Sequence, residues 1–443
     1  MSLIYNYENI KNKYSLEILI IAFAIILSGF KIFGYSVTFI IFLPYFFFNY
    51  KKYNIYIKES KIQTKLVLYF IAYFILMTFV GSLYINDLRI AFYWIPFFIV
   101  LIYLFLHNKI LLEKNNFYRE NFNKIIFSSG LIYFIIYLIM NILSIKVFSN
   151  EYEIQNNFWI GSSAGFHLST LFLSTLFILW RKINFKIKSL YLFSFILYTS
   201  LVSINSSRLG FLYLLIFLFF TIINCFTKRL FIQALLITFL ISNTYYYSSK
   251  ILSKDSFLEL GTYRETVSLR DSMRSISYRF STLHIFNNDK NSQLSGDDDR
   301  VLELFIGYEK FKEINIFNKF FGTGWYSSRI TIKEKRNEII KSFNNRLTNY
   351  KSIKPLSIVQ LQGIVALILD TGILGLSIIS FFYFLTLKKI IFSYRGIILK
   401  NFMITMLCMN VFCLFIGYPY ANLPYWLIFI PGGFFQFNQK LSN

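Results

Sequence analysis

One arginine lies where charged residues are seldom found. Arg208 belongs to the stretch NSSRLGFLYLLIFLFF (205–220), at the start of a long apolar run. Its planar guanidinium group can bind phosphate through two parallel hydrogen bonds. Ser206 and Ser207 add hydroxyl donors, Gly210 permits close approach, and a helix N-terminus favours an anion through its free N–H groups. The stretch predicts a phosphate clamp; the alternative is an interfacial arginine whose charged end extends to the lipid headgroups.

A carboxylate lies inside a second apolar run. Asp370 occurs in LILDTGILGL (367–376), where hydrocarbon offers no partner for a charge. Two roles fit an acid at this position, namely a structural partner for an arginine or a proton acceptor. The sequence leaves both roles open.

The sequence contains no convincing metal or cofactor site. His107, His167 and His284 are far apart, and all three cysteines fall within expected membrane helices. The acidic run GDDDR (296–300) is interpreted as a solvated turn that caps the next helix, with metal binding as the alternative. We expect no metal ion and no cofactor.

These residues are embedded in a strongly apolar chain. Of its 443 residues, 56% are hydrophobic and 15% are charged, which excludes an ordinary soluble protein. Runs of about 17–25 apolar residues, long enough to cross a bilayer, recur along the sequence. We expect an all-α polytopic integral membrane protein with about twelve transmembrane helices, and a re-entrant pair is the alternative at the short second one. The expected helices are 16–33, 35–48, 63–83, 88–106, 124–147, 163–180, 187–204, 207–226, 229–247, 356–387, 397–416 and 422–437.

Basic residues are distributed unevenly between the connections of these helices. Segments on one side contain 22 lysines and arginines, whereas the short connections on the other contain only Lys31, Arg89 and Lys146. Lysine and arginine accumulate on the cytoplasmic side of membranes, so both termini are expected there. The net charge of +23 reflects this orientation and attraction to anionic lipid, and it does not indicate nucleic-acid binding.

One long polar segment interrupts the helices. It divides the chain into residues 1–247, 248–355 and 356–443, and it is expected to form a largely helical cap outside the membrane. The segment contains eight of the fourteen arginines, which together favour an anionic ligand. For any single arginine, simple solvation of a polar cap is the alternative.

Three motifs resemble those of the bacterial O-antigen polymerase and O-antigen ligase superfamily. SSRLGFL (206–212) is similar to its Ser-Arg-small motif at a helix start. RVLELFIGYEKFKEINIFNKFFGTGW (300–325) is similar to its pattern of arginine, amphipathic helix and Gly-x-Gly, which falls here on Gly322 and Gly324. LDTGILGL (369–376) is similar to the glycine signature of the helix after the large periplasmic loop.

The resemblance covers roughly residues 190–385 and separates two activities. O-antigen ligases have a histidine about ten residues before the glycine signature. The corresponding stretch here, SIVQLQGIV (357–365), has Gln360 and Gln362 instead. This departure favours a polymerase.

The resemblance implies a membrane glycosyltransferase of GT-C-like architecture in the bacterial inner membrane. Such an enzyme joins undecaprenyl-pyrophosphate-linked oligosaccharide repeat units on the periplasmic side without a metal, while arginines stabilise the pyrophosphate leaving group. Its expected partners are these lipid-linked oligosaccharides, membrane lipid and a chain-length regulator protein, with no nucleic acid. The alternatives are an O-antigen ligase acting on lipid A core, a protein-glycosylating transferase, and a lipid-linked sugar flippase or transporter. The last predicts two related halves and short loops, which the sequence lacks.

The expected site combines these motifs with residues of the cap. Arg208 and Arg300 are predicted to form the catalytic pyrophosphate clamp, with Asp370 as a further catalytic residue. Substrate-binding residues are expected from the arginines, the glycine motif and aromatic side chains suited to stacking on sugars, although aromatic residues are common throughout: Ser206, Ser207, Arg279, Arg329, Arg346, Gly322, Gly324, Trp325 and Tyr326.

Overall fold

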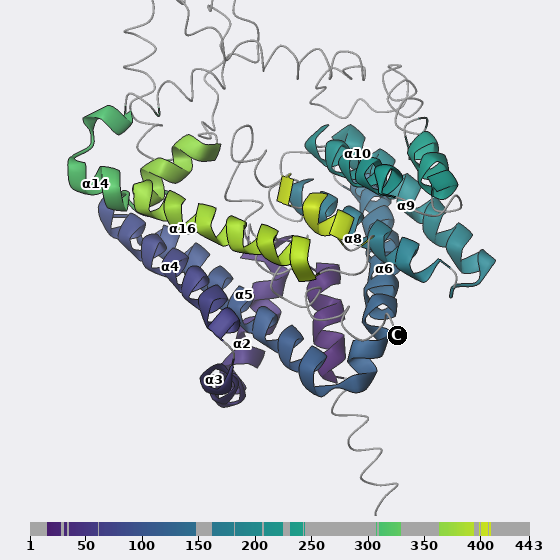
Figure 1. The fold of residues 1–443 in the computed structure, drawn as a ribbon, viewed down its shortest axis with the longest axis horizontal. Coiled ribbons are helices and arrows are strands. Elements are labelled where there is room, and N and C mark those ends of the chain that lie inside the picture. The colour runs from purple at the N-terminus through teal and green to yellow at the C-terminus, as the bar shows by residue number, and fades with distance from the viewer. Residues whose placement is uncertain are drawn as a thin grey trace, which may run out of the picture.

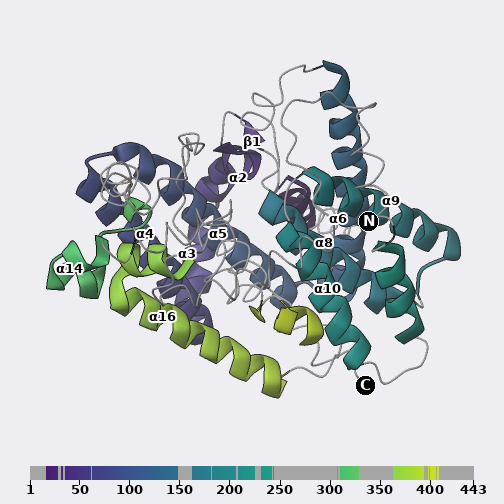
Figure 2. The ribbon, with the colours of Figure 1, turned by 90° about the horizontal axis from the view of Figure 1, so that it is seen from above.

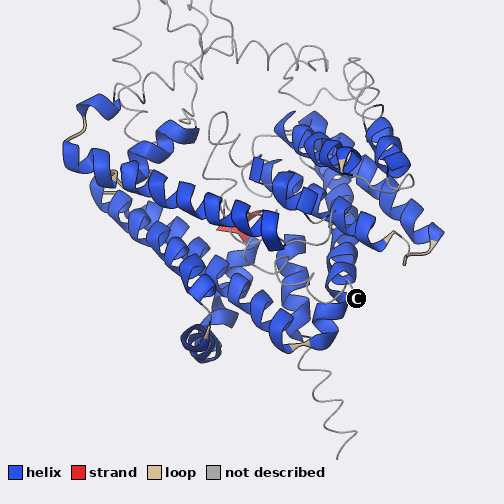
Figure 3. Ribbon diagram, in the orientation of Figure 1, coloured by secondary structure: helices blue, strands red, loops and turns tan. Residues whose placement is uncertain are grey.

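A computed structural model gives the structure of the chain in segments. Figure 1 draws these as ribbons, and Figure 3 shows that nearly all of them are helical. The described residues are 16–27, 31–32, 35–60, 62–147, 162–180, 182–205, 208–224, 231–241, 243, 307, 310–328, 363–393, 398, 400–405 and 407–408.

Three of the described helices are long and apolar enough to cross a membrane. They comprise Thr64–Ile85, Leu88–Lys114 and Val365–Leu385, and shorter apolar helices occur at Leu16–Leu27, Thr170–Leu179, Leu214–Ile223 and Phe231–Ile241. Hydrocarbon offers no hydrogen-bonding partner to the backbone, and a helix pairs its backbone N–H and C=O groups internally. The predicted all-α membrane class agrees with these apolar helices. The count of twelve spans stays a prediction, and the last expected span, 422–437, lies outside the described part of the chain.

Most described helices coincide with expected spans. Helix α4 covers Ile62–Ile85, α5 Leu88–Lys114, α6 Asn116–Val147, α8 Ser162–Leu179, α9 Phe185–Asn205, α10 Arg208–Ile223 and α16 Gly363–Ser393. Helix α10 thus begins at Arg208. Several helices extend past the apolar run that predicts them, because polar residues can continue a helix beyond the hydrocarbon.

The N-terminal region differs from the expected pair of helices. Residues Lys31–Ile32 form strand β1, which pairs antiparallel with β2 (Tyr35–Ser36), so the helix expected over 16–33 is wrong at its end. Gly29 and Gly34 flank β1 in the sequence, and glycine disfavours continued helix. Helix α2 (Val37–Phe48) follows, and a separate short helix that the sequence analysis does not anticipate, α3 (Tyr50–Glu59), precedes α4.

Helices α4 and α5 form an antiparallel pair joined by a tight turn. Asn86 adopts a φ of 57°, and the Asp87 side chain accepts a hydrogen bond from the backbone N–H of Arg89 at the start of α5. The Arg89 guanidinium donates to both Asp87 carboxylate oxygens at 2.9 Å. These hydrogen bonds lower the pKa of Asp87 below its ordinary value.

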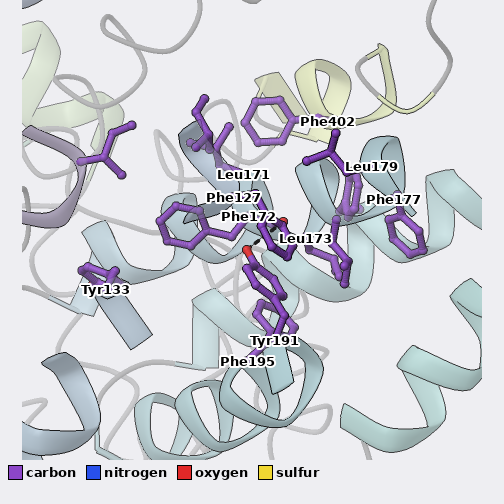
Figure 4. Close-up of a cluster of buried hydrophobic side chains, with 14 of the residues drawn as sticks. Phe127, Tyr133, Leu171, Phe172, Leu173, Phe177, Leu179, Tyr191, Phe195 and Phe402 are labelled. Atoms are coloured by element: carbon purple, nitrogen blue, oxygen red, sulfur yellow. Dashed lines mark hydrogen bonds between the residues drawn. The ribbon is translucent and has the colours of Figure 1, made fainter. Parts of the chain in front are cut away.

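The apolar side chains of the described residues pack into two clusters. The first joins α6, α8, α9 and α10, and Figure 4 shows part of it, including the Tyr191 hydroxyl that donates to the Phe172 carbonyl at 3.2 Å. The second joins α2, α3, α4, α5 and α16. Figures 1 and 2 show these two groups of helices on opposite sides of the molecule. Tertiary packing of this kind fixes which helix ends face each other.

Candidate functional site

Segment 322–328, with the sequence GTGWYSS, lies between α4 and α16. It follows the short helix α14 (Ile316–Phe321), whose N-terminus is capped by the Asn315 side chain and which ends at Gly322. Figure 1 shows α14 in green beside the ends of α4 and α16. We call residues 322–328 the wedge segment.

Glycine is required where the wedge segment meets its neighbours. Gly322 and Gly324 have φ values of 85° and 98°, which favour glycine. A Cβ on Gly324 would lie 2.0 Å from the backbone nitrogen of Gly81, and a Cβ on Gly81 would lie 2.4 Å from the Trp325 carbonyl oxygen. The backbones of α4 and the wedge segment are therefore in direct contact, and the backbone N–H of Trp325 donates to the Met77 carbonyl at 2.7 Å.

Helix α16 is broken where the wedge segment contacts it. Gly372 has a φ of 67° and a ψ of −175°, which interrupts the helix after Thr371. The carbonyls of Leu369 and Asp370 accept hydrogen bonds from the N–H groups of Thr323 and Gly324 at 2.9 and 2.8 Å. Carbonyls released at a helix break need such partners inside an apolar environment, so the wedge segment stabilises the break.

Asp370 binds the same segment through its side chain. The residue is fully buried, and its Oδ2 accepts the N–H of Tyr326 at 2.8 Å. Its Oδ1 accepts the N–H of Ser328 at 2.8 Å and the Ser327 hydroxyl at 3.2 Å. The carboxylate thus caps the turn at Ser327 and Ser328 in the way that an N-cap aspartate caps a helix, but from another element. These contacts give the carboxylate a structural role, and the two roles predicted from the sequence, partner of an arginine or proton acceptor, stay predictions.

The two aromatic residues of the wedge segment have different environments. Trp325 is fully buried, and its ring contacts Phe74, Trp94 and Phe98 at centroid distances of 5.0, 6.0 and 6.0 Å. Tyr326 is half-buried, has a φ of 71° and lies 5.9 Å from Trp94. The stacking role predicted for Trp325 would require its ring to leave this cluster, whereas Tyr326 keeps part of its surface exposed.

The structure brings together five of the predicted site residues, Gly322, Gly324, Trp325, Tyr326 and Asp370. Arg208 begins α10, which packs against α8 and α9 in the other helix group. Its side chain lies outside the described part of the structure. The remaining predicted residues lie outside the described part of the chain: Ser206, Ser207, Arg279, Arg300, Arg329 and Arg346. The arginine clamp therefore stays a prediction.

Sequence reasoning missed several residues of this contact. Gly81 lies in the apolar run of α4, where a single glycine gives no indication of a partner elsewhere in the chain. Thr323, Ser327 and Ser328 bind α16 through hydroxyl or N–H groups, and their only signal was the density of small polar residues after the glycine motif. Tyr73 donates to the Thr371 carbonyl at 3.2 Å, which no sequence pattern indicates.

The described contacts of this site hold backbone segments in place. Within the described residues, no group of three or more histidine, cysteine, aspartate or glutamate side chains could hold a metal ion. The wedge segment instead binds two apolar helices through backbone groups and one carboxylate. No protein-family model matches the chain, and no curated protein matches it either.

Proposed function

We propose that this protein is a membrane glycosyltransferase that polymerises lipid-pyrophosphate-linked oligosaccharides on the external side of the membrane. The product is O-antigen or a related surface polysaccharide. The proposal rests on the resemblance in the sequence, and one structural observation supports it. The Gly-x-Gly motif at residues 322–324 and the acidic glycine signature at 369–376 were identified separately, and their backbones are hydrogen-bonded to each other.

In the proposed reaction, a hydroxyl oxygen of one lipid-linked repeat unit attacks the anomeric carbon of another. The new glycosidic C–O bond forms while the bond from that carbon to the pyrophosphate oxygen breaks. The lipid pyrophosphate leaves with the electron pair, and the hydroxyl proton passes to a base. Fixed cations stabilise negative charge that develops on such a leaving group, which is the role proposed for Arg208 and Arg300.

Asp370 has a positioning role in this proposal. Its carboxylate holds the backbone of Tyr326 and Ser328, immediately before Arg329 in the sequence. A chain fixed at residue 328 limits the region that the following arginine can reach. Asp370 would thereby orient the cap relative to the membrane helices without contacting the reacting atoms.

The test is complementation of a deletion strain, with surface polysaccharide separated on a gel. Arg208→Lys and Arg300→Lys keep the charge but lose the planar fork, and we expect each to reduce polymer formation by about 100-fold. Arg89→Lys is the matched control, since Arg89 lies in the first turn of α5 and pairs with Asp87. Normal polymer from the two test variants at normal protein levels would refute the clamp.

The alternatives give different products. Loss of a polymerase leaves a single repeat unit on the lipid A core, whereas loss of a ligase leaves the core bare. An assay of the purified protein in detergent distinguishes a flippase from both enzymes, because transport requires two compartments and detergent micelles provide none. Chain elongation of lipid-linked repeat units under that condition supports the polymerase, and its absence with folded protein argues against it.

A further inference from the structure

Helix α3 has two chemically different faces. Tyr53 and Tyr56 are buried against the membrane helices, whereas Lys51, Ile55 and Lys58 are exposed. The spacing of these three residues, at i, i+4 and i+7, places them on one side of the helix. Helix α3 therefore turns away from the protein a face with two lysines around one isoleucine, and the exposed Glu59 lies at the C-terminal end of that face.

Three side chains of α3, Tyr53, Tyr56 and Lys52, make polar contacts that fix its orientation. The Tyr53 hydroxyl lies 2.9 Å from Nδ1 of the fully buried His107, and Nε2 of that ring lies 2.9 Å from the Glu17 carbonyl. Since a carbonyl only accepts, Nε2 carries a proton, and in the neutral ring Nδ1 accepts from Tyr53. Tyr56 donates to Glu113 at 2.6 Å.

The third contact is an ion pair between Lys52 and Glu17, at 2.5 Å. It draws one lysine of α3 towards the protein. Lys51 and Lys58 make no ion pair within the part of the chain that the structure describes. Because the inner face is held at three points, the outer face cannot rotate inward.

Exposed apolar side chains precede and follow α3 in the sequence. Phe47 and Phe48 at the end of α2 are 73% and 83% exposed, and Ile62 at the start of α4 is 75% exposed. The Lys65 ammonium lies 3.3 Å from the Lys58 carbonyl, which adds a third cation beside α3. Cations interleaved with aromatic and aliphatic side chains are typical of helices that lie in the interface of an anionic membrane.

The position of α3 in the fold agrees with an interfacial helix. Figure 1 shows α3 nearly end-on, whereas α4 and α5 run across the same view. Helix α3 ends three residues before α4 begins, and α4 is long enough to span a bilayer. The wedge segment contacts α4 at Gly81, about 28 Å further along the helix at 1.5 Å per residue. Helix α3 and the wedge segment are thus at opposite ends of α4.

We propose that the outer face of α3 with Lys51, Ile55 and Lys58, together with the adjacent Lys65 of α4, docks on the headgroups of anionic phospholipids at the membrane surface opposite the expected cap. The lysines bind the phosphates, and Ile55, Phe47 and Phe48 enter the boundary between headgroups and acyl chains. Each lysine near an anionic surface strengthens binding by about fivefold. This inference does not depend on the glycosyltransferase activity, because it concerns the other end of α4.

The test places a fluorophore beside the face and varies the lipid. Asn54→Cys, in full-length protein with Cys225, Cys408 and Cys413 replaced by alanine, is labelled with an environment-sensitive dye and reconstituted in nanodiscs. We expect blue-shifted emission and quenching by headgroup-proximal nitroxide lipid in discs containing phosphatidylglycerol, with weaker effects in pure phosphatidylcholine. High salt should reduce the difference, because lysine–headgroup attraction is screened.

Charge variants separate this surface from general attraction. Replacement of Lys51, Lys58 and Lys65 by glutamine should remove most of the response to phosphatidylglycerol, and replacement by arginine should preserve it. The matched control replaces the exposed Lys114, Lys124 and Lys186, an equal change in charge. An equal loss in this control would refute a specific α3 surface. A dye that stays open to aqueous iodide in both lipids would also overturn the proposal and point to a soluble partner.

Discussion

At the scale of single residues, Asp370 shows how a carboxylate can be kept in an apolar helix. Three donors of the wedge segment reach its two oxygens. A buried carboxylate needs such donors, because burial without hydrogen bonds is costly. The charge that appears anomalous in the apolar run is therefore explained by a contact 42 to 44 residues away in sequence.

Removal of the Asp370 carboxylate should destabilise the protein. Asp370→Ala leaves two backbone N–H groups and one hydroxyl without their acceptor, which we expect to cost at least about 3 kcal/mol of unfolding free energy. Asp370→Asn should cost less, since its amide oxygen can still accept from Ser328 while its NH₂ group opposes the N–H of Tyr326. Ser327→Ala should cost about 1 kcal/mol.

Thermal unfolding in detergent measures these changes. Asp87→Asn is the control, because asparagine also caps helices and Asp87 lies in the α4–α5 turn; we expect no measurable shift in its unfolding midpoint. An Asp370→Asn protein of wild-type stability that makes no polymer would contradict the positioning role and favour a proton acceptor.

At the scale of elements, the principal finding is the joint between α4, α16 and the wedge segment. Helix α16 is interrupted at Gly372, and the wedge segment supplies the N–H groups that its freed carbonyls require. Helix α4 contributes Gly81, whose lack of a side chain allows backbone contact. Neither the break nor the wedge segment would be stable in hydrocarbon without the other.

A methyl group at Gly81 should separate these elements. Gly81→Ala keeps the helical conformation of α4, but its Cβ would lie 2.4 Å from a backbone carbonyl that cannot rotate away. We expect a loss of about 1–3 kcal/mol in unfolding free energy and faster proteolysis at the cap. The control is Leu83→Ala on the same helix, where the side chain is 58% exposed and packs less against protein. Equal stability of both variants would show that the wedge segment has another resting position.

At the scale of the whole molecule, the structure arranges two helix groups with different contents. One contains the wedge segment, Asp370 and α3, and the other contains α10, which begins at Arg208. An active site that uses both Arg208 and the wedge segment must form between these groups. The predicted arginines other than Arg208 belong to the polar segment 248–355, which is expected to form the cap.

The two ends of α4 should face opposite sides of the membrane. In a background without native cysteines, Ile316→Cys on α14, which is 84% exposed, should react with a membrane-impermeant maleimide applied to intact cells. Asn54→Cys on α3 should react only after the membrane is permeabilised. Labelling of both positions from outside would contradict α4 as a membrane span and the orientation derived from the basic residues.

Sequence patterns predicted the broad elements better than the contacts between them. Apolar runs predicted α4, α5, α8, α9, α10 and α16 closely, because hydrocarbon requires helices wherever a chain crosses it. The same reasoning failed at residues 31–32 and did not anticipate α3. There, the glycines beside β1 and the contact of Tyr53 with His107 of α5 favour the observed structure, and a hydropathy window averages over such local features.

The sequence by itself determined that the chain is a helical, strongly basic membrane protein with one long polar segment, and that Arg208 and Asp370 are unusual within it. Composition and periodicity suffice for this because the membrane acts on each helix separately. Only the tertiary structure decided that Asp370 caps the wedge segment, that Gly81 allows the backbone contact, and that α3 turns Lys51 and Lys58 outward. These facts depend on atoms from distant parts of the chain meeting within about 3 Å, a distance at which hydrogen bonds form and glycine becomes necessary.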